Sequence, residues 1–459
     1  MKKRLLTAAA AVLLLTGCGR QGYEGFVIPE QGKSTLRPVE DIFTERHYEG
    51  TAPTQEQVQR TVRTGVGLCE LRKMETYYDV TLDYGKGSPY EAGAAYADAI
   101  LEIYDGYAAT VEGYLYENIK AAFSKLGGDY SAIRSRTEAI FSALREPYRQ
   151  ELLGFAERIS GGTEEMAEDG ILSKEEAMLL QLIPDVLRGT ACSAISADGS
   201  ATASGQRITC RLLEWQLGSE NQLCAAQALV HMRNGAESFT SVTYLGFLTV
   251  LTAVNSSGLM IGELDVGSAN EIRYSAENKR SYTYDLRYAL EHYSSAREAA
   301  AFLCDNAAHY PYCVNVLCTD AQDAVIAELS VTPEDGSPVV RDSSTPLHDG
   351  LSWEDPAYLC AVNSFAAKGN ADQLTYTSGN RVRWDRYGQL FCGQRGLTAG
   401  RFKELITAEK TDNSLERIRS GGLVHLVIAD YATQRLQAVF TGTEGLADEP
   451  VFIDLGSWL

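Results

Sequence analysis

The sequence predicts a mixed α/β fold in which a largely helical segment precedes a series of short strands. From about residue 88 to residue 187, apolar and small residues recur at three and four positions, which is the spacing of amphipathic helices. After Cys192 the pattern changes to short runs rich in β-branched and aromatic residues, which indicate strands. Strands and helices do not alternate regularly, so the pattern favours sheets covered by helices over a parallel βαβ fold.

The first folded part of the chain combines a strand region with several helices. The stretch Cys69–Asp83 is rich in Tyr, Val and Thr, so part of it is expected to be a strand. Ser88 is followed by proline and then by glutamate at the third helical position, so we expect it to cap a helix. Further helices are expected over about 129–160 and 173–187, and Ser173 starts the second of these with a capping box.

Short apolar runs after Cys192 predict most of the strands. The C-terminal sequence LVHLVIADYATQRLQAVF predicts a hairpin, whereas Asp285–Asp305, Arg386–Phe391 and Arg401–Ile406 have helical patterns. The polar stretch Asp335–Pro356 is expected to be a long loop. The other expected strands are Arg207–Trp215, Ala225–Met232, Phe239–Val254, Leu259–Val266, Cys313–Thr319 and Ala324–Leu329.

The first residues have the features of a secretory leader. Three basic residues precede the apolar run Leu5–Leu15, which is too short to span a membrane. The run ends in LTGC, which resembles the bacterial lipobox and implies cleavage before Cys18 and lipidation of its thiol. The alternative is an ordinary secretory site with an incidental cysteine. We therefore expect a leader over 1–18, a flexible tether over 19–50, and an extracytoplasmic protein anchored to the bacterial membrane by acyl chains.

The balance of charges argues against a nucleic-acid partner. The chain has 41 Lys and Arg residues against 61 Asp and Glu residues, and its net charge of −20 disfavours nucleic acids and anionic membrane surfaces. The ten cysteines match no zinc motif and the sequence has no Gly-rich phosphate loop, so we expect neither a metal nor another cofactor. An oxidising compartment permits disulfides, but their pairing does not follow from the sequence.

The stretch Thr190–Trp215 brings a thiol close to opposite charges. Cys192 begins one strand, and the turn signals DGS and SGQ lead to a second strand that carries Arg211 and Glu214. A nucleophilic thiol needs a cation to lower its pKa and a group to accept its proton. An offset of three places Arg211 and Glu214 on opposite faces of an ideal strand, so a bulge or a strand end is needed if both are to point at Cys192.

Four stretches, in this order, resemble one known family. They are GSPYEAG (Gly87–Gly93), YRQELLGFAERISGG (Tyr148–Gly162), Cys192 with RLLEW (Arg211–Trp215), and YLCAVNSFA (Tyr358–Ala366) followed by SGNRVRWDR (Ser378–Arg386). The chain thereby resembles the acyl-coenzyme A:6-aminopenicillanic acid acyltransferase family of N-terminal-nucleophile (Ntn) hydrolases, related to choloylglycine hydrolases and penicillin V acylases. The resemblance implies a four-layer αββα sandwich and an enzyme that cleaves or transfers the acyl group of a small-molecule amide.

The resemblance also implies roles for individual residues. Cys192 would be the nucleophile and would form a thioester, after autoproteolysis between Ala191 and Cys192 frees its α-amine as the base. Glu214 would orient that amine, Arg211 would lie beside the thiol, and Asn363 would donate to the oxyanion. The remaining network residues would be Arg383 or Arg386, with Asp265 near a further oxyanion-hole position. A mainly helical segment over 51–191 and a catalytic segment over 192–459 would result.

Three positions depart from the family pattern. Ala191 replaces the commoner glycine, Glu214 replaces an aspartate, and the carboxylate of Asp265 would repel an oxyanion if it pointed into the site. Two alternatives therefore remain open: a binding or scaffold lipoprotein in which Cys192 is a buried structural residue, and an unprocessed cysteine hydrolase that uses another base. Among the six histidines, His231, His309, His348 and His425 lie in no setting that indicates a papain-like Cys–His pair. The sequence does not distinguish N-acyl amino acids, bile-salt conjugates, β-lactam side chains and cell-wall amides as substrates.

Overall fold

The larger of two β-sheets contains strands from both halves of the chain. The computed structural model describes residues 46–123, 130–187, 191–266, 277–371, 378–408, 418–419 and 422–458. The sheet order is β1-β2-β3-β6-β7-β8-β9-β10-β11-β12. Its neighbouring strands are antiparallel except for β3 and β6, which pair in parallel. The strands are β1 (Arg60–Thr64), β2 (Cys69–Lys73), β3 (Tyr78–Asp83), β6 (Gln227–Arg233), β7 (Phe239–Tyr244), β8 (Thr252–Asn255), β9 (Met260–Asp265), β10 (Val314–Thr319), β11 (Ala324–Leu329) and β12 (Val339–Arg341).

The smaller sheet carries the stretch that contains Cys192. Its six strands lie in the order β13-β4-β5-β14-β15-β16, and all neighbouring pairs are antiparallel. The strands are β4 (Ala191–Ala197), β5 (Ile208–Glu214), β13 (Tyr358–Ala361), β14 (Leu423–Asp430), β15 (Arg435–Phe440) and β16 (Ile453–Ser457). The predicted hairpins β4–β5 and β14–β15 are therefore confirmed.

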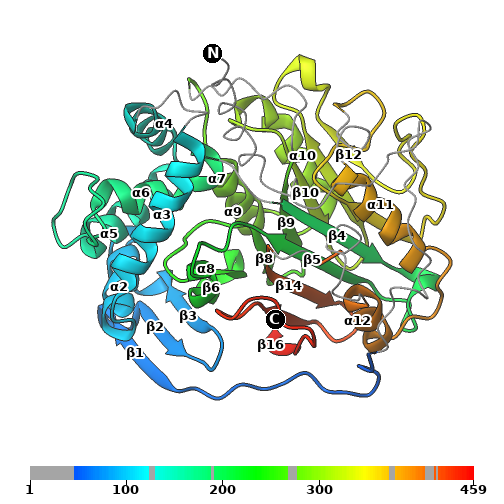
Figure 1. The fold of residues 1–459 in the computed structure, drawn as a ribbon, viewed down its shortest axis with the longest axis horizontal. Coiled ribbons are helices and arrows are strands. Elements are labelled where there is room, and N and C mark those ends of the chain that lie inside the picture. The colour runs from blue at the N-terminus through cyan, green and yellow to red at the C-terminus, as the bar shows by residue number, and fades with distance from the viewer. Residues whose placement is uncertain are drawn as a thin grey trace, which may run out of the picture.

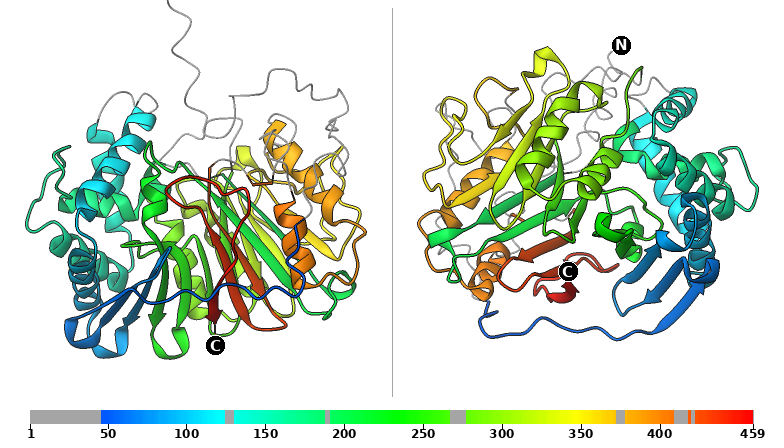
Figure 2. Two further views of the ribbon diagram at one scale, coloured as in Figure 1. Left: turned by 60° about the horizontal axis from the view of Figure 1, so that its bottom comes forward. Right: turned by 180° about the vertical axis from the view of Figure 1, so that it is seen from behind.

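Helices cover an outer side of each sheet, whereas side chains of α3, α4, α6, α7 and α8 belong to the buried cluster at the inner faces (Figures 1 and 2). Side chains of α2, α5, α9 and α10 share one buried cluster with the larger sheet, and side chains of α11 and α12 share another with the smaller sheet. The helices are α2 (Pro89–Ile103), α3 (Tyr107–Phe123), α4 (Tyr130–Ser142), α5 (Glu146–Ile159), α6 (Lys174–Gln181), α7 (Ile183–Val186), α8 (Gln222–Ala225), α9 (Tyr282–His292), α10 (Ala296–Asn306), α11 (Ser378–Phe391) and α12 (Ala399–Thr407). The prediction of a mixed α/β body is confirmed.

A third buried cluster joins the inner faces of the two sheets. Cys192 and Leu213 of the smaller sheet lie in this cluster together with Leu264 and Leu317 of the larger sheet. The thiol therefore lies between the two sheets, on the side of β4 that faces away from α11 and α12.

Two of the motifs that carry the family resemblance are explained by the packing of α2 on α5. A Cβ atom at Gly93 would overlap the carbonyl oxygen of Glu151, and one at Gly154 would overlap the carbonyl oxygen of Tyr90. Only glycine permits this close approach of two helix backbones. Ser88 caps α2 with a complete capping box, as predicted. These motifs therefore support the scaffold.

Several elements differ from the predictions at their boundaries. The helix expected over 129–160 is interrupted before α5, which has proline in its first turn, because proline has no N–H for the preceding turn. The helix expected over 285–305 divides into α9 and α10, and Ser295 caps the second part. The strand expected over 239–254 divides into β7 and β8, and the loop expected over 335–356 contains β12. The segment 51–191 contributes β1, β2 and β3 in addition to its helices.

Cys18, the leader over 1–18 and most of the tether over 19–50 lie outside the described residues. Within the described part of the chain, no helix is both long and apolar enough to cross a bilayer.

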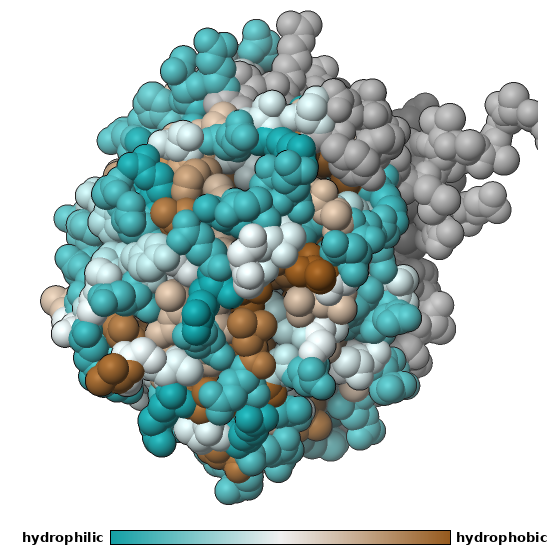
Figure 3. All heavy atoms as spheres, turned by 90° about the vertical axis from the view of Figure 1, so that its left-hand side faces the viewer, coloured by the Kyte–Doolittle hydropathy of each residue, from teal (hydrophilic) through white to brown (hydrophobic). Residues whose placement is uncertain are grey.

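The face on the side of α2 to α5 is mainly hydrophilic, with small separate apolar patches (Figure 3). Leu101 and Ile171 are two of the exposed large apolar side chains of the protein.

Candidate active site

The register of β4 and β5 decides which side chains face Cys192. Cys192 pairs with Leu213, Ala194 pairs with Arg211, and Ala191 pairs with Glu214, without a break in register. Because residues paired across two strands share a face and neighbours along a strand alternate, Arg211 lies on the face of Cys192. Glu214 lies on the opposite face. The bulge that would have turned both charges toward the thiol is not present in β5.

Arg211 holds the thiol against the larger sheet. Its Nη2 atom is 3.2 Å from Cys192 Sγ and donates to the backbone carbonyl of Glu263 on β9 at 2.6 Å. Nη2 also lies 3.9 Å from a carboxylate oxygen of Glu263, and both side chains are fully buried. A Cβ atom at Gly262 would approach Arg211 Cγ to 2.9 Å, so the missing side chain there makes room for the arginine. Glu263 was not predicted from the sequence to be a site residue, so this contact was not expected.

The backbone of Cys192 is held by the amide side chain of Asn363. Cys192 N donates to Asn363 Oδ1 at 2.7 Å, and Asn363 Nδ2 donates to the backbone carbonyl of Asp265 at 2.6 Å. Asp265 therefore contributes its main chain to this contact. One of the two N–H groups of Asn363 Nδ2 is engaged with Asp265, so the oxyanion role expected for Asn363 would fall to the other N–H group.

Arg383 connects Cys192 to Glu214 from α11. Its Nη1 atom donates to the Cys192 carbonyl at 3.0 Å and to Glu214 Oε2 at 2.7 Å. Its Nη2 atom donates to Asn363 Oδ1 and to Asn380 Oδ1, both at 2.8 Å. The structure thus brings the predicted Cys192, Glu214, Asn363 and Arg383 into one buried network. Glu214 reaches the nucleophile position through Arg383.

Arg386 and Asn380 show where the prediction from the stretch Ser378–Arg386 was incomplete. Arg386 is fully buried one turn beyond Arg383, and one of its side-chain hydrogen bonds goes to Gln389. Asn380, which sequence reasoning missed, accepts from Arg383 and donates to the Asn363 carbonyl at 2.8 Å. The signal available in the sequence was its spacing, because residues three apart share a helix face.

The thiol of the intact chain is in an environment that opposes ionisation. Cys192 is fully buried, and burial raises the pKa of its thiol to about 12 although Arg211 acts to lower it. The carboxylate of Glu263 adds to the increase of this pKa because it disfavours a second negative charge nearby. This arrangement therefore holds a protonated thiol near neutral pH.

The described residues contain no cluster of His, Cys, Asp and Glu that could hold a metal ion. No disulfide joins any two of the nine cysteines in the described ranges. Of the predicted site residues, Cys18 lies outside these ranges, and Ala191 is described only by its place at the start of β4.

Comparisons with known proteins give weak similarities. No family model matches the chain, and a search of curated proteins finds no match. Among solved structures, a Caenorhabditis elegans ortholog of N-acylethanolamine-hydrolyzing acid amidase is 17% identical, with a TM-score of 0.37, over 52% of this chain and 92% of that chain. A mutant of the conjugated bile acid hydrolase from Clostridium perfringens is 11% identical, with a TM-score of 0.35, over 57% and 92% of the two chains. At these TM-scores the similarity assigns neither fold nor function.

Proposed function

We propose that this protein is a cysteine amidohydrolase, or acyltransferase, of the Ntn type that cleaves a linear amide through a thioester on Cys192. The observation that carries the proposal is the pair of contacts at one residue. The main-chain nitrogen of Cys192 is 2.7 Å from Asn363 Oδ1, and its thiol is 3.2 Å from Arg211 Nη2. An Ntn nucleophile needs both atoms held, because the nitrogen becomes the base and the sulfur attacks the substrate.

The proposed body is a four-layer αββα sandwich. Three buried clusters support it: one between the inner faces of the sheets and one between each sheet and its helices. The two motifs at Gly93 and Gly154 have structural roles in this proposal. Only the network around Cys192 carries the chemistry.

The described chain corresponds to an uncut precursor in this proposal. Its thiol is buried and has a pKa of about 12, so it is not the form that attacks an external amide. Maturation begins when Cys192 Sγ attacks the Ala191 carbonyl, and the thiol proton passes to the peptide nitrogen as the bond between that nitrogen and the carbonyl carbon breaks. Water then hydrolyses the resulting thioester, which leaves a carboxylate on Ala191 and an α-amine and a thiol on Cys192. The new amine has a pKa near about 8 and can accept the thiol proton near neutrality.

The network gives each remaining residue a role in the mature form. Asn363 Oδ1 accepts from the nitrogen and so orients the amine, while Arg383 fixes the position of Asn363. Glu214 balances the charge of Arg383 from the outer face of β5. Arg211 stabilises the thiolate that forms when the amine takes the proton.

N-terminal sequencing and intact mass of the purified protein test the proposal directly. We expect two fragments, the second beginning at Cys192, and hydrolysis of a panel of N-acyl amides. Cys192→Ala should give one uncut, inactive chain. Cys210→Ala is the matched control. Cys210 lies on β5 and is fully buried like Cys192, but it belongs to the cluster under α11. A Cys192→Ala protein that is cut and active like the parent protein would contradict the proposal.

One observation favours a second candidate, a binding or scaffold lipoprotein that has lost catalysis. The thiol of Cys192 is fully buried, as a structural cysteine would be. This candidate predicts a single uncut chain that does not react with a thiol-directed acyl probe. An uncut chain that still hydrolyses an amide, and stops doing so as Cys192→Ala, would instead identify an unprocessed hydrolase.

We also propose that the protein is anchored at the extracytoplasmic face of the bacterial membrane through Cys18. The proposal is supported by the basic residues, the apolar run and the LTGC sequence at the start of the chain. Metabolic labelling with a palmitate analogue should mark the protein. Labelling that persists in Cys18→Ala would contradict this location.

A further inference from the structure

The turn that carries Asn363 is held from the larger sheet by the side chain of Asn315. Asn315 lies on β10, and its Nδ2 atom donates to the Val362 carbonyl at 3.1 Å and to the Ser364 carbonyl at 2.8 Å. These two carbonyls lie on either side of Asn363 in the chain. One fully buried amide thus binds both neighbours of the residue that holds the Cys192 nitrogen.

Asn363 is the central residue of a three-residue turn. Ser364 N donates to the Val362 carbonyl at 2.8 Å, which closes the turn directly after β13. Such a turn has one internal hydrogen bond, so in a buried loop its other main-chain groups need partners from elsewhere. The carbonyl of Asn363 accepts from Asn380, and the carbonyls on either side of it accept from Asn315.

The cross-strand neighbour of Asn315 holds the next part of the same loop. Asn315 pairs with Glu328 of β11, and both side chains are fully buried. The carboxylate of Glu328 accepts from Ala366 N at 2.9 Å and from Ala367 N at 3.1 Å. The larger sheet therefore binds the main chain of this loop at two consecutive places, and Asn315 is the contact that lies next to the site.

The amide of Asn315 has one orientation that fits these contacts. Each N–H of Nδ2 can donate to one carbonyl, whereas the reversed amide would place its oxygen against two carbonyl oxygens. Its Oδ1 atom has no hydrogen-bond partner among the described residues. The side-chain hydrogen bonds that Asn315 makes within the described chain therefore all go to the turn that carries Asn363.

We propose that Asn315 is a positioning residue for the reaction at Cys192, because it fixes the turn from which Asn363 meets the nitrogen of the nucleophile. The inference rests on the proposed amidohydrolase function and adds a residue to that site. Asn363 Oδ1 lies 2.7 Å from Cys192 N and 2.8 Å from Arg383 Nη2. A shift of the turn by about 1 Å would disturb both contacts, and a misplacement of that size can cost about 100-fold in rate.

Asn255 provides a matched control in the same sheet. It is the last residue of β8 and is 4% exposed, and its Nδ2 atom donates to the carbonyls of Leu290 at 2.9 Å and Tyr293 at 2.8 Å. Its Oδ1 atom also accepts from two main-chain N–H groups. Asn255→Leu therefore removes the same pair of donor bonds as Asn315→Leu, at a place whose hydrogen bonds lie outside the Cys192 network.

Hydrogen–deuterium exchange in the full-length Cys192→Ala protein tests the positioning without catalysis. The amide of residue 192 donates to Asn363 Oδ1, so its exchange reports on the position of that side chain. Relative to other amides of β4, it should exchange at least tenfold faster in Asn315→Leu and at an unchanged rate in Asn255→Leu. Asn315→Gln, which keeps both donors, should restore part of the protection. Unchanged exchange at residue 192 in an Asn315→Leu protein that melting curves show to be folded would overturn the inference.

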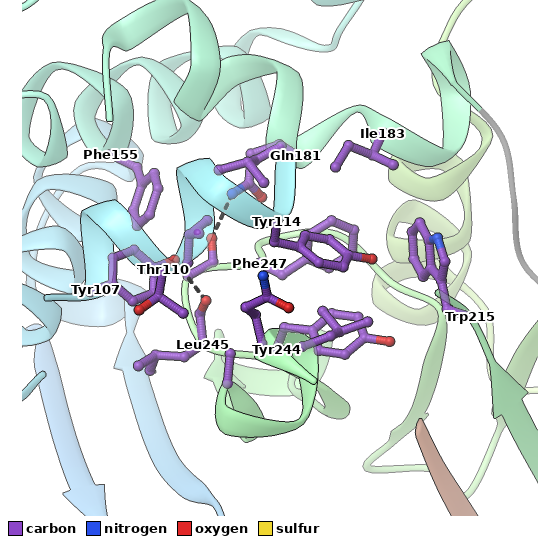
Figure 4. Close-up of a pocket in the computed structure, with 16 residues that line it drawn as sticks. Tyr107, Thr110, Tyr114, Phe155, Gln181, Ile183, Trp215, Tyr244, Leu245 and Phe247 are labelled. Atoms are coloured by element: carbon purple, nitrogen blue, oxygen red, sulfur yellow. Dashed lines mark hydrogen bonds between the residues drawn. The ribbon is translucent and has the colours of Figure 1, made fainter. Parts of the chain in front are cut away.

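Kinetics of the mature protein give a second result that a loss of stability alone would not produce. Asn315 and the turn at Asn363 do not line the aromatic pocket that begins at Trp215, directly after β5 (Figure 4). Asn315→Leu should therefore lower kcat on the order of 10- to 100-fold and leave KM unchanged, whereas Asn255→Leu should change neither. A folded Asn315→Leu chain that is not cut, while Asn255→Leu is cut normally, would show the same loss at maturation and support the inference.

The outcomes separate this inference from the proposed function. Hydrolysis that depends on Cys192 but keeps the parental kcat in Asn315→Leu would overturn the role of Asn315 and leave the function intact. The expected exchange pattern in a protein that is never cut and never hydrolyses an amide would support the hold on the turn and overturn the function. An equal fall of kcat in Asn315→Leu and Asn255→Leu would mean that Asn315 supports only the fold, and would overturn the inference.

Discussion

Arg383 is the residue whose replacement tests the buried network most directly. It donates hydrogen bonds to the Cys192 carbonyl, Glu214, Asn363 and Asn380, and its side chain is 9% exposed. Arg383→Met keeps most of the apolar stem and removes every one of these donors. The carboxylate of Glu214, which is 1% exposed, then loses the cation that faces it.

The expected cost follows from this burial. Removing one partner of a buried ion pair typically costs about 3–5 kcal/mol, because the remaining charge is left in a poorly solvated site. Glu214→Gln combined with Arg383→Met removes the charge as well as the cation. The double variant should therefore cost less than the sum of the two single variants by about 1–3 kcal/mol.

Urea unfolding of full-length protein measures these free energies. A Cys192→Ala background keeps the chain intact, so that all variants unfold from the same starting chain. Arg401→Met is the matched control, because its guanidinium pairs with Glu404 but is 43% exposed, and its loss should cost at most about 1 kcal/mol. A cost for Arg383→Met that equals the control, or single-variant costs that simply add, would refute the reasoning.

Three further predictions concern the close contact at Gly262, the buried carboxyl group of Asp185, and the relative reactivity of two thiols. Gly262→Ala should destabilise the protein by about 1–3 kcal/mol and slow chain cutting, because a Cβ atom there lies 2.9 Å from Arg211 Cγ. Burial raises the pKa of Asp185 to about 7, so the folded chain keeps a proton that the unfolded chain releases above about pH 4. The free energy of unfolding should therefore fall as the pH rises from about 4 to about 7. Asp185→Asn should remove up to about 1.4 kcal/mol of this loss per pH unit, measured by urea unfolding. In the uncut chain, iodoacetamide should label the half-buried Cys392 before the fully buried Cys192, as peptide mass spectrometry would show.

Each of these predictions has a control or a contradicting result. Gly113→Ala on α3 meets open space and should be neutral or slightly stabilising, so equal losses for Gly113 and Gly262 would exclude the steric explanation. An unchanged pH dependence in Asp185→Asn would mean that this carboxyl is ionised in the folded chain. Labelling of Cys192 ahead of Cys392 would show that the thiol is accessible before any cut.

Local signals in the sequence predicted the elements that depend on neighbouring residues. Ser88 and Ser173 cap their helices as expected, because a capping box is complete within four residues. The β4–β5 hairpin was predictable because its turn residues and apolar runs are adjacent in sequence. The identity of Cys192, Arg211, Glu214, Asn363 and Arg383 as neighbours came from the family resemblance, since these residues come from separate segments.

The remaining features depend on pairing that no short stretch encodes. The face of Glu214 follows from the register of β5, and its partner Arg383 comes from a helix that begins 164 residues later in the chain. The role of Gly262 depends on the packing of the two sheets against each other, because its contact, Arg211, lies on the other sheet. The split of the predicted helix before α5 shows that periodicity alone does not locate a proline-dependent boundary.

The parallel pairing of β3 with β6 has a consequence for a protein that is cut before Cys192. Tyr78–Asp83 and Ala228–Arg233 run in the same direction and form one ladder inside a continuous sheet, so main-chain hydrogen bonds would keep the two halves joined if the peptide bond before Cys192 were cut. Refolding of the cut form after full denaturation would then be a bimolecular reaction. The refolding rate should depend on the protein concentration for the cut form and not for the uncut chain.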